Sequence, residues 1–135
     1  MNMNETCKLT MLGTGNALVT KCYNTCFTIH TPKTMILVDA GGGNGILAQL
    51  EKAGINLDDV HHIFITHAHT DHIIGVLWVL RVYIQFVLRG MVEGQLHIYG
   101  HDKSLLVLRT MIELMLPAKL QKQIGTSVAI WIRMK

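Results

Sequence analysis

Apolar residues in the first half of the chain come in short runs that glycines and polar turns separate. Runs at 8–12, 26–30 and 35–38 predict three β-strands. The turn residues at 31–34 join the last two strands as a hairpin. Further runs at 62–66, 95–99 and 127–132 predict three more strands, of which the first is buried.

Three segments have the spacing of helices. Residues 46–53 form a short helix that Gly54 ends. Residues 102–116 form another, with Asp102 as its cap and Pro117 as its stop. The third segment, 73–88, is almost wholly apolar. Its polar residues Arg81 and Gln85 lie on one narrow stripe, so it predicts a helix buried on most sides. The stretch is shorter than the ~20 apolar residues of a membrane span, and we expect no membrane partner.

Composition adds a size and a charge balance to this pattern. The 135 residues are 50% hydrophobic and 16% charged, which excludes disorder and suffices for one domain, residues 1–135. A net charge of +3 argues against a protein that coats nucleic acid. The segment after Gly100 carries six basic residues against two acidic ones, a net charge of +4. This segment is either a solvated face or a surface that steers an anionic substrate. Its basic residues are Lys103, Arg109, Lys119, Lys122, Arg133 and Lys135.

Three cysteines, Cys7, Cys22 and Cys26, are an odd number and predict no disulfide framework. The sequence has no signal-peptide pattern, and we expect a cytoplasmic protein. Cys22 and Cys26 have a C-x3-C spacing that can contribute to a metal site. Because no second pair accompanies them, we interpret them as buried or incidental thiols.

A cluster of imidazoles and a carboxylate follows the strand at 62–66. Extended backbone after a strand places His67 and His69 on the same side, where both can bind one cation. If the loop then turns, Asp71 and His72 face a second cation. These ligands suit zinc, and also iron or manganese. In a chain of this composition the H-x-H-x-D-H pattern arises by chance roughly once in a thousand sequences.

A competing interpretation is a dinucleotide site. A strand, then Gly13 and Gly15, then Asp39 after a later strand, imitates that fingerprint. The third glycine position holds Leu18, however, and residues 18–25 leave no room for a crossover helix. The glycine cluster at 41–45 either cradles a phosphate or makes a tight turn that lets the metal loop approach, and we prefer the turn.

Three motifs together resemble the metallo-β-lactamase superfamily, in particular its ribonuclease Z-like branch. HAHTDH at 67–72 matches the metal signature. LGTGNA at 12–17 matches the opening strand and loop, and LVDAGGG at 37–43 matches the strand below the metal loop. The resemblance covers about residues 8–100. It implies an α/β fold, an αββα sandwich of which this chain holds the N-terminal half. It also implies hydrolysis of an ester or phosphodiester by a metal-bound hydroxide.

The resemblance also assigns roles to residues. His67 and His69 bind the first metal of a dinuclear zinc site, and Asp71 and His72 bind the second. Asp71 also orients or deprotonates the attacking water. Asp39 either hydrogen-bonds a ligand histidine and fixes its tautomer, or is a turn-forming aspartate. Manganese and iron are alternative metals.

The chain departs from the family in its last third. The family completes its site with a histidine, a bridging aspartate and a final histidine, but no histidine follows His101 here. His101 is a surface residue or a third ligand. The remaining histidines, 30, 61, 62 and 97, have no ligand spacing.

We therefore expect a metal-dependent hydrolase, a phosphodiesterase resembling ribonuclease Z, with a C-terminally truncated domain. The alternative is a catalytically incomplete fragment that retains a partial metal site. The expected substrate is a small anionic or ester molecule, with RNA also open. Because one face of the sheet is expected to pack against the half of the sandwich that is missing here, we also expect self-association.

Overall fold

One six-stranded sheet, whose strand order follows the chain from β1 to β6, organises the protein. The structure is a computed structural model that describes residues 6–132. The first three strands are antiparallel, and the last three run parallel to β3. The strands are β1 (Lys8–Gly13), β2 (Cys26–His30), β3 (Met35–Val38), β4 (His62–Ile65), β5 (Leu96–Gly100) and β6 (Val128–Ile132).

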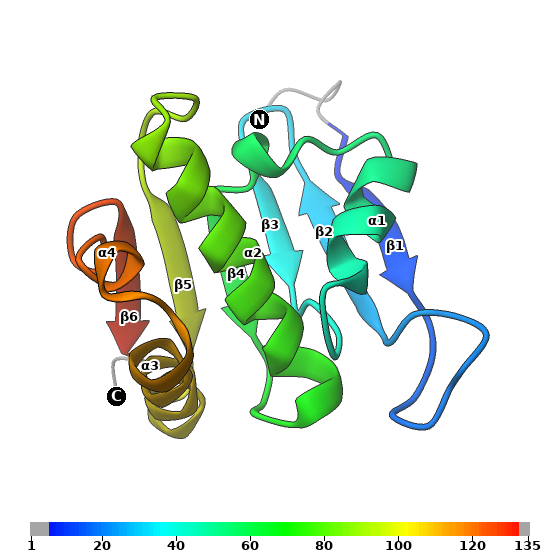
Figure 1. Ribbon diagram of the computed structural model, residues 1–135. Helices are drawn as coiled ribbons and strands as arrows, with labels where there is room; N and C mark the ends of the chain where they lie inside the picture. The colour runs from blue at the N-terminus through cyan, green and yellow to red at the C-terminus, as the bar shows by residue number, and fades with distance from the viewer. Residues whose placement is uncertain (1–5, 133–135) are drawn as a thin grey trace.

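The helices lie on one side of this sheet (Figure 1). Each connection between parallel strands contains a helix, and such crossovers are right-handed, so consecutive ones stay on the same face. The helices are α1 (Gly45–Lys52), α2 (Thr70–Leu88), α3 (Asp102–Met115), α4 (Ala118–Gln121) and the short 3-10 helix η1 (Leu57–Asp59).

All six predicted strands and the three predicted helices are present. Helix α2 begins at Thr70, so Asp71 and His72 lie in its first turn and not in the preceding loop. The prediction that Asp102 caps α3 was wrong. His101 has the extended backbone of the cap, and its Nδ1 accepts a hydrogen bond from the backbone N–H of Lys103 at 3.2 Å. Of the basic segment, Arg133 and Lys135 lie outside the described residues.

The core lies between the sheet and α2, the long apolar helix. Val76, Leu80 and Ile84 of this helix are fully buried, as are Ile63 and Ile98 of the sheet. Burial of each such side chain contributes about 1.5–3 kcal/mol. By length and composition α2 could cross a membrane, and its buried side chains make it the core helix of this fold.

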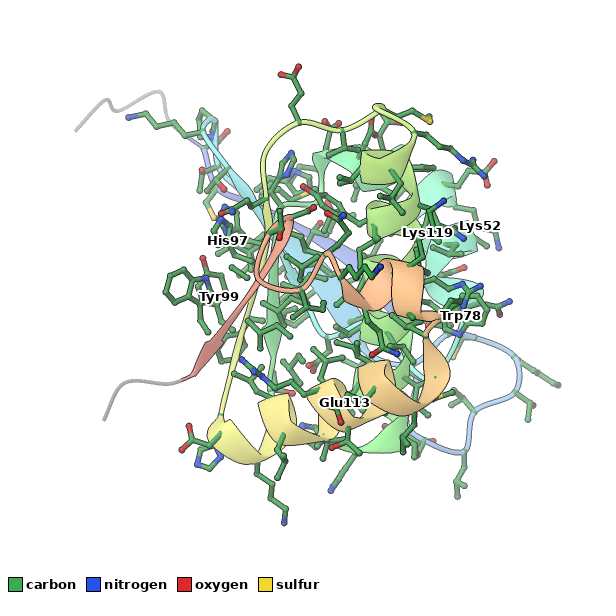
Figure 2. The ribbon with its side chains drawn as sticks, turned by 60° about the vertical axis from the view of Figure 1, so that its left-hand side comes forward. Lys52, Trp78, His97, Tyr99, Glu113 and Lys119 are labelled. Carbon is green, nitrogen blue, oxygen red and sulfur yellow. The ribbon has the colours of Figure 1, made fainter. Side chains whose placement is uncertain are left out.

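The opposite face of the sheet carries no helix among the described residues. Side chains alternate along each strand, so in β4 Ile63 and Ile65 are buried, whereas Phe64 is 44% exposed. Figure 2 shows His97 and Tyr99 on this face, pointing away from the helices. The expected αββα sandwich is thus present as one α/β layer pair, with one sheet face open.

Candidate metal centre

The ends of β3 and β4 bring the candidate site together. The two strands are parallel neighbours, with Val38 opposite Phe64, and the backbone N–H of Asp39 donates to the Phe64 carbonyl at 2.9 Å. Parallel strands end at the same sheet edge, so Asp39 after β3 lies beside Thr66 after β4. This pairing places an aspartate next to the histidine motif.

Asp39 is a buried carboxylate whose oxygens are bound by three donors. Its Oδ1 accepts from the backbone N–H of Thr66 at 2.8 Å. Its Oδ2 accepts from the Thr66 hydroxyl at 2.6 Å and from Nδ1 of His72 at 2.8 Å. The residue is 4% exposed and has a φ of 57°, a left-handed conformation that aspartate adopts more readily than most residues.

These bonds fix the tautomers of two imidazoles. The Thr66 hydroxyl has one hydrogen, which it donates to Asp39, so its oxygen accepts from Nδ1 of His67 at 2.8 Å. His72 donates from Nδ1 to Asp39. Both rings therefore keep the lone pair of Nε2 free for a ligand, the arrangement that second partners of metal-bound histidines produce.

The four predicted ligands meet at the N-terminus of α2. The His67 ring lies 4.4 Å from the ring of His69 and 4.1 Å from that of His72, between centroids. Oδ2 of Asp71 is 3.2 Å from Nε2 of His72. Two electron-pair donors at this distance need a shared proton or cation, and imidazole with carboxylate fits a divalent metal.

One group among the described residues has its possible ligand atoms within 4.8 Å of one another, namely Asp39, His67 and His72. His69, which is exposed, and Asp71 are not part of this group. Because the oxygens of Asp39 are already bound by three donors, its contacts are those of a residue that orients His72. Which of these side chains hold a metal stays a prediction.

Two glycines allow α2 to approach the end of β3. A Cβ on Gly75 would lie 1.8 Å from the Ala40 carbonyl oxygen. The backbone N–H of Gly75 donates to the Gly41 carbonyl at 2.8 Å, and that of Ala40 donates to the His72 carbonyl at 3.1 Å. Gly41 has a φ of 75°. These contacts agree with our interpretation of the glycine cluster as a turn that admits the metal loop.

Tyr23 and Asn24, which no sequence pattern predicted, hold this turn in place through hydrogen bonds to its backbone. The Tyr23 hydroxyl lies 2.6 Å from the Ala40 carbonyl oxygen and 3.0 Å from that of Gly43. Oδ1 of Asn24 accepts from the Gly42 N–H at 3.0 Å. Burial raises the pKa of Tyr23 to about 12, so its hydroxyl stays a donor. Nothing in the local sequence around Tyr23 signals these contacts, because both partners lie 17 or more residues away.

The other histidines lie apart from the cluster. His101 is exposed and caps α3. The remaining four imidazoles contact side chains of their own surroundings: His30 with Thr28, His61 with Tyr83, His62 with Tyr99, and His97 with Trp131.

The cysteines do not form a metal pair in this structure. Cys22 is exposed and Cys26 is fully buried, and both are free. Burial, with a smaller contribution from the charge of Asp39, raises the pKa of Cys26 to about 12. The Cys26 thiol therefore stays protonated, whereas a metal ligand must be a thiolate.

A cavity of about 970 Å³ adjoins the cluster. His67 and His69 line one end of it, and the start of α3, with His101 and Lys103, lines another. The sheet contributes aromatic side chains, Phe64, Tyr99 and Trp131. The cavity thus combines a cationic side chain, aromatic surfaces and the candidate ligands.

Comparison with known proteins identifies the family. The family model described as anti-Pycsar protein Apyc1 matches residues 7–124. The chain belongs to the Apyc1 family. It is 39% identical over 89 residues to the Apyc1 of Bacillus phage vB_BveM-Goe7, a match over 65% of this chain and 33% of that protein. It is 37% identical over 94 residues to the ribonuclease Z of Methanothermobacter thermautotrophicus, a match over 69% of this chain and 29% of that protein.

Solved structures agree with this assignment. Human tRNase Z, short form, matches with a TM-score of 0.65 and 26% identity over 78% of this chain and 38% of that one. The metallo-β-lactamase fold protein YhfI of Bacillus subtilis matches with a TM-score of 0.67 and 20% identity, over 95% of this chain and 47% of that one, and this likeness concerns the fold alone.

These matches confirm the predicted metallo-β-lactamase fold and the ribonuclease Z-like branch of this Apyc1-family chain. The chain spans about a third of the length of the curated relatives it matches.

Proposed function

We propose that this chain provides the metal-binding part of a metal-dependent phosphodiesterase. The observation that carries the proposal is the hydrogen-bonded chain from His67 through Thr66 and Asp39 to His72. It leaves two imidazole Nε2 atoms free beside His69 and Asp71, which is a donor set suited to divalent zinc, manganese or iron. Bound there, a divalent metal supplies a Lewis acid that polarises the phosphoryl group and activates water.

The side chains of the chain then have separate tasks. His67, His69 and His72 hold the metal together with Asp71. The Asp71 carboxylate, in the first turn of α2, also orients the attacking water and takes up its proton. Asp39 and Thr66 keep the two imidazoles in the ligand tautomer and prevent their rotation.

The adjoining cavity supports an anionic substrate. Lys103 and the start of α3 put positive charge at the cavity wall, while the aromatic side chains give flat surfaces for an organic group. The relatives are named ribonuclease Z and anti-Pycsar protein, and the first of these names supports an RNA or another phosphodiester as substrate.

A metal titration with an activity assay tests the proposal. The protein is stripped with a chelator, then zinc or manganese is added, and bound metal and hydrolysis of bis(p-nitrophenyl) phosphate are measured. We expect metal-dependent turnover that His69→Ala abolishes. His30→Ala is the matched control, since His30 contacts Thr28 away from the site, and it is expected to keep full activity.

A second candidate function is metal binding without turnover. It is favoured by the observation that the described residues offer one close group of three possible ligands, fewer than two metal ions require. Stoichiometric metal binding without hydrolysis would support this candidate. Absence of tight metal binding by a folded protein would refute both candidates.

A further inference from the structure

The N-terminus of α3 lies at the same edge of the sheet as the candidate metal centre. β4 and β5 are parallel neighbours, and Ile65 at the end of one pairs with Gly100 at the end of the other. The segments that follow, with His67 on one and His101 on the other, therefore leave the sheet about 4.8 Å apart. Helices α2 and α3 both begin at this edge (Figure 1). A molecule bound at the metal centre can thus extend to the first turn of α3.

Ser104, in this first turn, is a buried residue that reaches the cavity beside the metal centre. It is 4% exposed and belongs to the lining of that cavity. Its hydroxyl makes no hydrogen bond with another group of residues 6–132, and no fully enclosed side-chain oxygen or nitrogen there lacks a partner, so its exposed part includes Oγ. A hydroxyl that opens only into a cavity is a donor for a ligand in that cavity.

The backbone of the same turn offers a second donor. The N–H of Leu105 donates to the His101 carbonyl at 3.0 Å, as the helical pattern requires. The N–H of Ser104, one position earlier, has no backbone partner among the described residues. The positive end of the helix dipole lies at this turn as well. The N–H and the hydroxyl of one residue can therefore bind the same anion.

The tautomer of His101 makes its imidazole a third donor. Its Nδ1 accepts a hydrogen bond from the Lys103 N–H at 3.2 Å, so the proton of the neutral ring is on Nε2. His101 also lines the cavity. A metal ligand needs a free lone pair, whereas here Nδ1 is engaged and Nε2 carries a hydrogen. These contacts suit His101 to bind an anion rather than a metal.

Lys103 adds a full positive charge to these donors. Its side chain is exposed and lines the same end of the cavity. Ion pairs among residues 6–132 join only His72 to Asp39 and Asp71, so the Lys103 ammonium is unpaired within that range. Asp102, the acidic residue of the turn, is not part of the cavity lining. This end of the cavity therefore presents donors without an opposing carboxylate.

We propose that the first turn of α3 is a subsite for a second, non-scissile phosphate group of the substrate. The inference rests on the proposed phosphodiesterase function and narrows its substrate class to phosphodiesters that carry another phosphate nearby. Ser104 donates from its N–H and Oγ, His101 donates from Nε2, and Lys103 supplies the charge. Several donors around a helix N-terminus are the arrangement that binds phosphate oxygens. None of these donors belongs to a strand, so the subsite does not use the open face of the sheet.

Amide NMR of the metal-free full chain tests the subsite without any turnover. Inorganic phosphate is titrated at a pH well above about 6.5, so that the imidazoles of the metal centre are neutral. We expect saturable shifts of the Ser104 and Lys103 amide signals. Ser104→Ala and Lys103→Ala should each lower the phosphate affinity about tenfold. Because Lys103 is exposed, its replacement leaves the fold intact.

Lys119→Ala is the matched control. It removes the same charge from an exposed position of α4, outside the cavity lining, and should bind phosphate normally. Three results would overturn the subsite: no shift at Ser104, an equally strong response to acetate, or an equal loss of affinity in Lys119→Ala.

Kinetics of the metal-loaded chain connect the subsite to the substrate. A thymidine dinucleotide with a terminal phosphate should have a KM about tenfold lower than the same dinucleotide without it. Lys103→Ala should remove this difference, and Lys119→Ala should keep it. Equal KM values in the native chain would contradict the substrate class. If no phosphodiester is hydrolysed with any metal, the proposed function fails, and the phosphate titration still decides the subsite.

Discussion

The carboxylate of Asp39 accepts a hydrogen bond from Nδ1 of His72 at 2.8 Å, across 33 positions of sequence. The bond joins the end of β3 to the first turn of α2. It fixes the imidazole with Nε2 at 3.2 Å from Oδ2 of Asp71. One buried carboxylate thus couples the edge of the sheet to the geometry of the candidate metal centre.

Asp39→Asn is expected to weaken zinc binding by about 10–100-fold. Asparagine accepts the left-handed backbone of this position, so the change isolates the carboxylate. The amide nitrogen of asparagine is a donor, and it faces some of the three donors whose hydrogen bonds the aspartate oxygens accept. Competition with a chromophoric chelator measures the affinity. Asp59→Asn, an exposed carboxylate in η1, serves as control and should bind zinc normally.

Gly75→Ala is expected to destabilise the fold by about 3 kcal/mol or more, because a Cβ would lie 1.8 Å from the Ala40 carbonyl oxygen. Backbone on both sides prevents an easy adjustment. Gly43→Ala is the matched control, since no atom lies within 4 Å of its added Cβ. Urea unfolding followed by circular dichroism compares the two variants, and equal stabilities would contradict the close approach of α2 to β3.

The three thiols should react at different rates with Ellman's reagent. Cys7 and Cys22 are exposed, so both should react in the folded protein at neutral pH. Cys26 is fully buried and has a pKa of about 12, so its thiol should react only after unfolding in urea. Cys26→Ser should remove this late-reacting thiol alone. Rapid reaction of all three in the folded state would show that the start of β2 opens.

Stability should fall as the pH is lowered through about 6.5, the ordinary pKa of histidine. Burial, then the neighbouring imidazoles of His97 and His61, lower the pKa of His62 in the folded state. The unfolded chain therefore binds a proton in a range where folded His62 stays neutral, and protons favour unfolding. The loss of stability grows until the pH falls to the lowered pKa of His62 in the folded state, below which both states bind the proton.

Urea unfolding at a series of pH values measures this effect, and His62→Gln should make the dependence shallower. His30→Gln is the control for a general change in histidine content, because His30 pairs with Thr28 on β2. A slope that His62→Gln leaves unchanged would assign the acid sensitivity to other groups.

Local patterns predicted most of the fold because the strands are short, and β1, β2 and β5 end at a glycine or a turn. The hairpin of β2 and β3 and the helix that Gly54 ends follow from such signals. The start of α3 was placed one residue late, since aspartate is a better helix cap than histidine in general. Here β5 ends at Gly100, and His101 is the first residue free to take the cap conformation.

The candidate site was only partly predictable. The histidine motif lies in one continuous segment, so its residues were visible together. The contacts of Tyr23 and Gly75 with Ala40 are set by the tertiary approach of three separate segments. Periodicity carries no information about such approaches. Thr66 could not be predicted either, because its hydroxyl gains its hydrogen-bond partner only when the fold places Asp39 beside it.

The strand order β1 to β6 has a consequence for how the protein assembles on the ribosome. Each new strand pairs with the strand synthesised just before it, so every pairing in the sheet joins two consecutive strands of the chain. The β2–β3 pairing closes a short loop, and each later pairing joins strands that follow one another in the chain, so each closure costs less entropy than a pairing of strands farther apart in the sequence. The residues that form the candidate centre all lie between Tyr23 and Gly75. The centre can therefore be built by the nascent chain before β5 and β6 leave the exit tunnel.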